Sequence, residues 1–361
     1  MSLNDSRWHG WQTNLPRERD SMGPSAGKRI VVTGGSGFLG KFVVERLENE
    51  GARDIFVPRK RDYDLCHREV VARLYADAQP QILIHLAATV GGIGANRSNP
   101  GKFFYENMAM GLHVVDEARL YHRLEKLVIV GTTCSYPKHT PTPFREEDLW
   151  NGYPEETNAP YAVAKKALLV MAVGYREQYG LNGIYLIPAN LYGPGDNFDP
   201  ETSHVIPALI RKFVEAKEAG SASVDVWGTG EVSREFLYVE DAAEGIVLAT
   251  LRYGGKDPVN LGTGCEIRIR DLVDDIRNLV GYEGEVSWNS SRPDGQPRRR
   301  LDVKKALDEF GFCARTSLHE GLKKTLSWYE QARRGSQIAG TGTHDKPTTE
   351  RREDGSLTYP A

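Results

Sequence analysis

Short β-branched apolar runs alternate along the chain with longer segments whose apolar residues recur at helical spacing. The apolar runs are RIVVTG (29–34), DIFVP (54–58), ILIHLAA (82–88), LVIVGTT (127–133) and IYLIPANLYG (184–193). Between the first of these runs, FVVERLENEG (42–51) and REVVARLYADA (68–78) have the spacing of amphipathic helices. Strands that alternate with helices predict an α/β fold with a doubly wound parallel sheet, the Rossmann arrangement.

The same pattern divides the chain into four parts. Residues 1–27 are polar and show no period, which predicts a disordered extension. Residues 28–197 hold the strand and helix alternation and form the expected Rossmann domain. From 198 to 330 the alternation becomes irregular, and this range is expected to form mainly a smaller substrate-binding lobe. Residues 335–361 have almost no branched apolar side chains, which predicts a disordered tail.

Composition excludes several classes of protein. The chain has 361 residues, enough for roughly two domains. Its 46 Lys and Arg against 49 Asp and Glu leave a net charge of -3, so no nucleic-acid partner is expected. No apolar run reaches the ~18 residues of a membrane span, and the first residues lack the apolar segment of a secretory signal. We therefore expect a cytoplasmic protein with no membrane partner.

Four cysteines lie far apart, at Cys66, Cys134, Cys265 and Cys313. No pair has the close spacing of a zinc site or of a disulfide framework. The sequence therefore predicts neither a metal nor disulfides, and a reducing compartment fits best.

A glycine-rich turn joins the first predicted strand to the first predicted helix. It comprises Gly34, Gly35, Ser36, Gly37, Phe38, Leu39 and Gly40, and it fits both G-x-G-x-x-G and G-x-x-G-x-x-G. Such a turn allows the backbone to approach a pyrophosphate at a helix N-terminus. The alternative interpretation is a tight turn without a ligand.

The second strand predicts the type of dinucleotide. In NAD sites an acidic residue that binds the ribose follows about 20 residues after the glycine turn. Here Arg59, Lys60 and Arg61 stand at that place, which favours NADP because cations pair with a 2′-phosphate. Asp62 and Asp64 follow closely and leave NAD open, and a solvated basic turn is the structural alternative.

Tyr161 and Lys165 lie one turn apart on the helix predicted to begin at Pro160, so their side chains share a face. A nearby cation favours the phenolate, and we expect Lys165 to lower the pKa of Tyr161. Upstream, the strand 127–130 leads to Thr132, Thr133, Cys134 and Ser135 at the carboxyl edge of the sheet, where ligands bind in such folds. Either motif alone is a weak signal.

Together these motifs resemble the extended short-chain dehydrogenase/reductases and, within them, the GDP-L-fucose synthase family. The similarity covers about residues 28–329. Its specific stretches are AATVGGIGAN (87–96), GTTCSYP (131–137), PYAVAK (160–165), PANLYGPGDNF (188–198), SHVIPALIRKF (203–213), VWGTGEVSREFLYVED (226–241) and RPDGQPRRRLD (292–302). The resemblance implies epimerisation at carbons 3 and 5 and NADPH-dependent reduction at carbon 4 of a GDP-4-keto-6-deoxyhexose. It also implies an NADP(H) cofactor, a GDP-sugar-binding second lobe and a homodimer packed through the Tyr161 helix and a neighbour that begins near Lys102.

The resemblance assigns expected roles to individual residues. Tyr161 matches the proton donor at carbon 4, Lys165 positions the nicotinamide ribose, and Thr132 replaces the more usual Ser while keeping the hydroxyl. Cys134 and His204 match the acid/base pair of epimerisation. Besides the glycine turn, the implied cofactor contacts are Arg59, Arg61, Asp64, Leu65, Leu86, Ala87, Ala88, Lys165, Pro188, Asn190, Leu191 and His204. The implied substrate contacts are Thr132, Asn190, Lys212, Trp227, Arg234, Asp294 and Arg299.

The expected chemistry explains these residue types. A ketone at carbon 4 acidifies the hydrogens at carbons 3 and 5, and a thiol and an imidazole titrate close enough to neutrality to exchange those protons. Ser36 departs from family members that have Arg in the glycine turn, which removes one possible contact to a 2′-phosphate.

Three other functions remain as alternatives. One is a monofunctional epimerase or 4-reductase of another nucleotide 4-keto sugar, such as a GDP-heptose. A sugar-nucleotide dehydratase is disfavoured because Cys134 and Ser135 follow Thr133 where that chemistry uses an Asp-Glu pair. A non-catalytic NADP-sensing protein would retain the glycine turn without needing the catalytic set.

Overall fold

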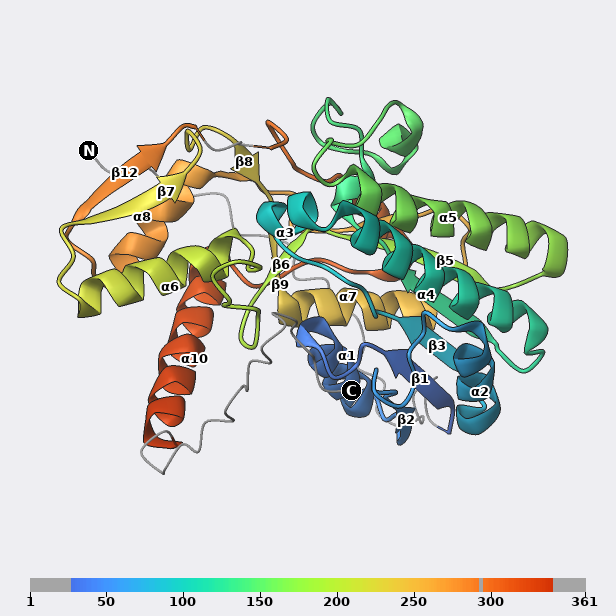
Figure 1. The fold of residues 1–361 in the computed structure, drawn as a ribbon. Coiled ribbons are helices and arrows are strands. Elements are labelled where there is room, and N and C mark those ends of the chain that lie inside the picture. The colour runs from blue at the N-terminus through green and yellow to red at the C-terminus, as the bar shows by residue number, and fades with distance from the viewer. Residues whose placement is uncertain (1–26, 292–294, 340–361) are drawn as a thin grey trace, which may run out of the picture.

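The computed structural model describes residues 27–291 and 295–339, and a larger and a smaller lobe lie side by side in it (Figure 1). The core of the larger lobe is a six-stranded sheet in the order β10-β5-β4-β3-β1-β2, and every neighbouring pair is parallel. The strands are β1 (Arg29–Thr33), β2 (Asp54–Phe56), β3 (Ile82–His85), β4 (Lys126–Val130), β5 (Gly183–Pro188) and β10 (Val259–Leu261). The predicted doubly wound sheet is confirmed.

Helices cover both faces of this sheet. On one face α1 (Phe38–Asn49) packs against α7 (Val239–Arg252). On the other face α4 (Pro100–Leu120) packs between α2 (Arg68–Ala78) and α5 (Ala159–Tyr179). Because the strands are covered on both sides, β4 and β5 are buried at nearly every position rather than at every second one.

The smaller lobe is built from short ladders and three helices. Strand β7 (Ser223–Trp227) pairs with β12 (Glu285–Asn289), and β8 (Ser233–Arg234) pairs with β11 (Ile267–Arg268). Helices α6 (Val205–Glu218), α8 (Ile269–Val280) and α10 (Leu318–Ala339) surround a second apolar core that includes Phe213, Leu272 and Leu322. A third ladder, between β6 (Asn190–Tyr192) and β9 (Phe236–Tyr238), links this lobe to the end of β5.

The chain crosses between the lobes more than once. After β7 and β8 it returns to the large sheet through α7 and β10, and α9 (Lys304–Phe310) packs against both of these elements. The division of the chain into domains at 28–197 and 198–330 therefore stays a prediction. The second range contributes strand β10 to the six-stranded sheet of the first range.

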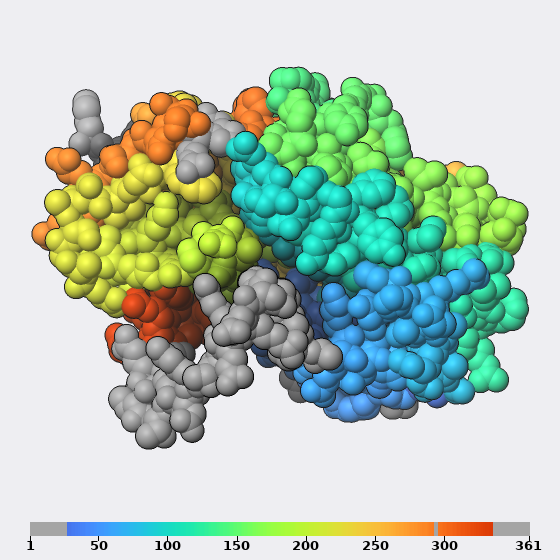
Figure 2. All heavy atoms as spheres, in the orientation of Figure 1, coloured from blue at the N-terminus to red at the C-terminus, as the bar shows by residue number. Residues whose placement is uncertain are grey.

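Two shorter helices and two helical turns complete the described chain. They are α3 (Ile93–Ser98), the turn Thr133–Ser135, the turn Glu146–Trp150 and the short α9. Figure 2 shows α3 and the start of α4 lying against the smaller lobe, where Gly92 N donates to Thr202 O at 3.0 Å. Among the described residues, no helix is both long enough and apolar enough to cross a bilayer.

The predictions for the chain ends fall mostly outside the described residues, as 1–26 and 340–361 do. Helix α10 continues to Ala339, past the predicted start of the tail at 335. Leu322, Leu326 and Tyr329 pack this helix onto the smaller lobe, and a packed helix propagates beyond its last buried turn at little cost.

Candidate active site

The glycine turn leaves no room for side chains at the places where it folds back on itself. A Cβ at Gly40 would lie 2.1 Å from Gly34 O, and one at Gly34 would lie 2.8 Å from Ala87 N. Gly34 has φ +72°, a conformation that other residues rarely adopt. Gly37 precedes the first helical residue of α1, and no side chain caps this helix in the described structure. The exposed N–H groups at this N-terminus fit a pyrophosphate.

The other predicted cofactor residues come from several segments, and one of these segments touches the glycine turn. Leu86, Ala87 and Ala88 follow β3, and the Ala87 backbone lies against Gly34. Arg59 and Arg61 follow β2 and are exposed to solvent. Asp64 accepts a hydrogen bond from Cys66 N at 3.0 Å, so its carboxylate is used within its own turn. Leu65 is buried. Pro188 ends β5, and Asn190 and Leu191 belong to the short strand β6 that follows.

The segment after β4 and the start of α5 bring three predicted catalytic residues together. Thr132 Oγ1 accepts a hydrogen bond from Cys134 N at 3.2 Å, which fixes the turn that presents the thiol. Burial and Cys134 raise the pKa of Tyr161, whereas a hydrogen bond from Thr132 acts in the opposite direction. Thr132, Cys134 and Tyr161 therefore form one interacting group at the carboxyl edge of the sheet.

The expectation that Lys165 lowers the pKa of Tyr161 is wrong in this structure. The ammonium group of Lys165 is buried and donates to Val130 O at 3.1 Å. Burial lowers the pKa of Lys165 to about 8, and Lys165 is not among the groups that shift the pKa of Tyr161. The one-turn spacing predicted a shared face correctly, but the strand carbonyl holds the ammonium instead of the phenol.

Arg299 touches one of the two residues predicted to epimerise the sugar and shifts the pKa of the other. Its Nη1 donates to Cys134 Sγ at 3.8 Å and to Asn190 Oδ1 at 3.2 Å. His204 precedes α6, and desolvation by the surrounding protein together with the positive charge of Arg299 lowers its pKa. The imidazole is therefore held in its neutral form more strongly than an ordinary His.

Gln296 orients the Arg299 guanidinium, and the sequence did not reveal this role. Gln296 Oε1 accepts from Arg299 Nε at 3.1 Å. Gln296 Nε2 in turn donates to Pro137 O at 3.0 Å, directly after the segment that holds Cys134. A polar residue within a run of Arg gives no signal of burial, yet Gln296 is only 2% exposed.

Glu235 is a second residue that the sequence reasoning missed. Its buried carboxylate accepts hydrogen bonds from the backbone N–H groups of Thr263, Gly264 and Leu301. It thereby fixes the segment that contains Arg299 against β8 and β9. An acidic residue directly before the apolar FLY strand was the available signal, since a charge at such a position needs several partners.

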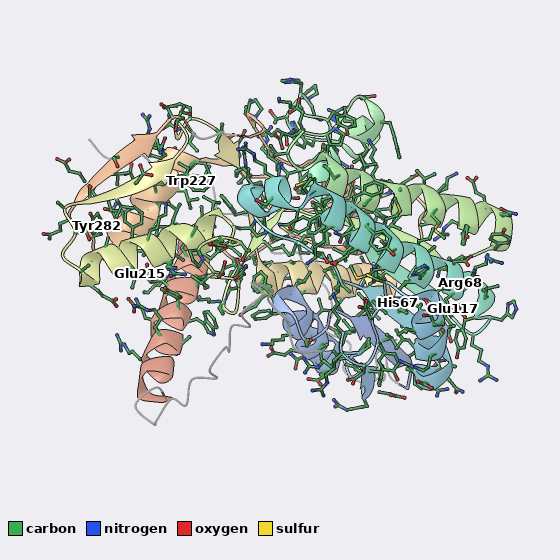
Figure 3. The ribbon with its side chains drawn as sticks, viewed as in Figure 1. His67, Arg68, Glu117, Glu215, Trp227 and Tyr282 are labelled. Carbon is green, nitrogen blue, oxygen red and sulfur yellow. The ribbon has the colours of Figure 1, made fainter. Side chains whose placement is uncertain are left out.

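The remaining predicted substrate residues lie on the smaller lobe. Lys212 Nζ donates to Asp225 O at 2.8 Å and lies 5.8 Å from the ring centroid of Trp227. Trp227 lies at the end of β7 (Figure 3). Its side chain is 51% exposed. Arg234 Nη1 donates to Ser233 O at 2.7 Å. Asp294 lies outside the described residues. Within the described parts of the chain, no group of three or more His, Cys, Asp or Glu side chains is arranged to hold a metal ion.

Comparison with known proteins identifies the family. Residues 30–262 match the model of the NAD dependent epimerase/dehydratase family. The chain is 41% identical over 303 residues to the probable GDP-L-fucose synthase 1 of Oryza sativa subsp. japonica, covering 84% of this chain and 92% of that protein.

Two solved structures extend this similarity. A GDP-L-fucose synthetase from Naegleria fowleri bound to NADP superposes with a TM-score of 0.77 at 27% identity, covering 86% of this chain and 96% of that one. A GDP-6-OMe-4-keto-L-xylo-heptose reductase from C. jejuni superposes with a TM-score of 0.79 at 28% identity, covering 87% of this chain and 99% of that one.

Proposed function

The chain belongs to the NAD dependent epimerase/dehydratase family, and from that premise we propose that it converts a GDP-4-keto-6-deoxyhexose to GDP-L-fucose or a close analogue. The reaction comprises epimerisation at carbons 3 and 5 and NADPH-dependent reduction at carbon 4. The observation that carries the proposal is the group of Thr132, Cys134 and Tyr161 at one sheet edge, with Arg299 linking Cys134 to Asn190.

Reduction uses groups that follow β4 and groups on α5. The bound cofactor supplies a hydride for carbon 4. Tyr161 donates its phenolic proton to the oxygen on that carbon, because its raised pKa keeps it protonated at neutral pH. Thr132 shares the hydrogen bond to the same oxygen, and Lys165 positions the nicotinamide ribose.

Epimerisation uses Cys134 and His204. Inversion requires one group to remove a proton and another to return one from the opposite face, and these two residues come from different lobes. The lowered pKa of His204 keeps the imidazole unprotonated at neutral pH, so the ring is available as the base that removes a proton. Arg299, which touches Cys134, supplies a positive charge beside the enolate that forms when the proton leaves.

The cofactor of this chain is NADP(H). Arg59 and Arg61 are exposed to solvent after the end of β2, and they are the residues that would hold the 2′-phosphate of the bound cofactor. The carboxylate of Asp64 is engaged with Cys66 N, so it competes poorly as a partner for a ribose hydroxyl. This difference supports a preference for NADPH over NADH.

We further propose a homodimer that packs through α4 and α5. Phe104 and Leu112 on α4 and Val170 on α5 are 39%, 43% and 55% exposed. Apolar side chains of this size on two adjacent helices are typical of a buried interface. Replacement of Leu112 and Val170 by Glu should convert a dimer to a monomer in sedimentation velocity, and an unchanged mass would contradict the interface.

The proposed compartment is the cytoplasm. All four cysteines are free in the structure, and Cys134 must remain a thiol for the proposed chemistry. Fractionation of the source cells with an antibody to the protein would test the location.

The deciding experiment incubates the enzyme with GDP-4-keto-6-deoxy-mannose and NADPH in D₂O and identifies the products by NMR. The wild-type enzyme should incorporate deuterium at carbons 3 and 5 and oxidise NADPH. Cys134→Ser should lose the exchange while retaining NADPH binding, since the thiol lies outside the glycine turn. Exchange at the parental rate in this variant would show that Cys134 is structural.

The heptose reductase similarity favours one alternative function. If the enzyme reduces a GDP-4-keto-heptose faster than the deoxyhexose in the same assay, the substrate assignment changes to a heptose. Reduction without deuterium exchange would identify a monofunctional reductase. Binding of NADPH without turnover of any keto sugar would identify an NADP-sensing protein.

A further inference from the structure

Tyr185 contacts both segments that hold the proposed reduction machinery. It lies in the middle of β5 and is 1% exposed. Its hydroxyl donates to the backbone carbonyl of Lys165 on α5 at 2.9 Å. Its ring also covers Gly131, where an added Cβ would lie 2.4 Å from the ring. One buried phenol therefore touches α5 and the residue directly before Thr132.

The Tyr185 hydroxyl remains a donor under all ordinary conditions. Burial, followed by the proximity of Tyr161, raises the pKa of Tyr185, and a hydrogen bond with Ser135 only partly opposes this. A protonated phenol beside a carbonyl gives a directed contact rather than general packing.

Ser135 provides a second anchor for the same helix. Its hydroxyl donates to Ala162 O at 3.3 Å and is buried. Ala162 follows Tyr161 directly, and Lys165 lies one turn further along the helix. Helix carbonyls already accept bonds within the helix, so these additional donors fix how α5 is rotated about its axis relative to the sheet.

We propose that Tyr185 is a positioning residue for the reduction step, which sets the placement of Tyr161 and Lys165 relative to Thr132. The inference rests on the proposed function, because it concerns the same site. Reactive groups that are displaced by about 1 Å lose roughly a hundredfold in rate, so a contact that fixes the catalytic turn affects turnover more than binding. Cys134 shares its turn with Thr132, but Tyr185→Phe keeps the ring against Gly131 and removes only the hydroxyl that bonds α5, so epimerisation should be affected far less than reduction.

The test compares Tyr185→Phe with the matched control Tyr75→Phe. Tyr75 is also a phenol that is 1% exposed, and its hydroxyl donates to a helix carbonyl, Val114 O, at the same distance of 2.9 Å. Tyr185→Phe should lower kcat for NADPH oxidation about tenfold, with KM for the keto sugar and deuterium exchange at carbons 3 and 5 unchanged. Both substitutions should lower the melting temperature by similar amounts, because each removes one buried hydrogen bond. Tyr75→Phe should leave kcat at the parental value.

The outcomes separate this inference from the proposed function. Parental kcat in Tyr185→Phe overturns the inference, and so does an equal fall in exchange and reduction, because that would mark a general loss of structure. An effect of the same size in Tyr75→Phe overturns it as well. If the wild-type enzyme itself turns over no keto sugar, the proposed function fails and the inference fails with it.

Discussion

The two lobes differ in how they present polar side chains. In the larger lobe Lys165 is 2% exposed and is held by a strand carbonyl, and β5 is buried at every position. In the smaller lobe Trp227 is 51% exposed at the end of β7, a strand whose burial alternates from one residue to the next. The contrast indicates a division of labour: rigid, desolvated groups suit proton transfer, whereas exposed groups on short strands suit recognition of a large polar substrate.

The largest expected effect tests the buried side of this comparison. Tyr161→Phe keeps the ring and its packing but removes the proton donor, so NADPH oxidation should fall by roughly 10²–10⁴-fold. Deuterium exchange at carbons 3 and 5 should continue, because Cys134 and His204 handle those protons. Stopped-flow absorbance and NMR measure the two rates, and reduction at the parental rate would remove Tyr161 from the mechanism.

The desolvation of Lys165 should appear as a pH dependence of stability. Burial lowers the pKa of Lys165 to about 8 from 10.5, so between these values the unfolded chain binds more protons than the folded one. The free energy of unfolding should therefore rise with pH across this window, by about 3 kcal/mol in total at ~1.4 kcal/mol per pH unit. Below about pH 8, Lys165 is charged in the folded and the unfolded chain, so the folded protein bears the full free-energy cost of burying the ammonium group.

Two variants isolate this contribution. Lys165→Met should show a smaller rise in urea unfolding than the wild-type protein between about pH 8 and about pH 10.5, because Lys126, whose pKa burial also lowers to about 8, keeps its own contribution. Lys212→Met removes a partly buried cation of the smaller lobe, whose pKa desolvation also lowers, and should retain the larger part of the rise that Lys165 provides. Parallel pH curves for the wild-type and Lys165→Met proteins would show that the ammonium is solvated.

A smaller effect tests the exposed residues of the smaller lobe. Arg234→Ala should raise KM for the GDP-sugar roughly 10–100-fold, the value of a charge-assisted hydrogen bond, while kcat stays near the parental value. Arg268→Ala, which removes an ion pair with Asp271 on the same lobe, should change neither constant. If Arg234→Ala lowers kcat and leaves KM unchanged, the assignment of substrate recognition to the smaller lobe is contradicted.

The smallest effect concerns cofactor choice. Replacing Arg59 and Arg61 by Ala should reduce the preference for NADPH over NADH about tenfold, because exposed ion pairs are individually weak. Arg53→Ala, an exposed change before the same strand, is the control. If the ratio of kcat/KM for NADPH to kcat/KM for NADH does not change, residues other than Arg59 and Arg61 bind the 2′-phosphate.

The sequence predicted the larger lobe better than the smaller one for a physical reason. Buried parallel strands are long apolar runs, and β1, β3, β4 and β5 all stand out in this way. Strand β10 consists of Val259, Asn260 and Leu261, which is too short and too polar to be recognised as part of a core sheet. Its place depends on contacts far away in sequence, such as the hydrogen bond from Tyr136 OH to Asn260 Oδ1 at 2.7 Å.

The candidate site shows the same limit. Local spacing correctly placed Tyr161 and Lys165 on one helix face, yet it did not reveal that Val130 O holds the ammonium. The contact of Arg299 with Cys134 joins segments 165 positions apart, and no spacing rule predicts it. Residue type indicated what each group can do, while the tertiary fold decided which partner it meets.

The return of the chain to β10 has a consequence for synthesis on the ribosome. Until residue 261 has emerged, β5 is an unpaired edge of the sheet, and unpaired edges favour aggregation. Phe144 then binds the backbone of Arg300 and Asp302, so Arg299 reaches Cys134 only when nearly the whole described chain has been translated. The glycine turn and β1 to β5 are complete much earlier. A nascent chain should therefore bind dinucleotide before it can handle a sugar, and its release from chaperones should coincide with the docking of residues 299–302.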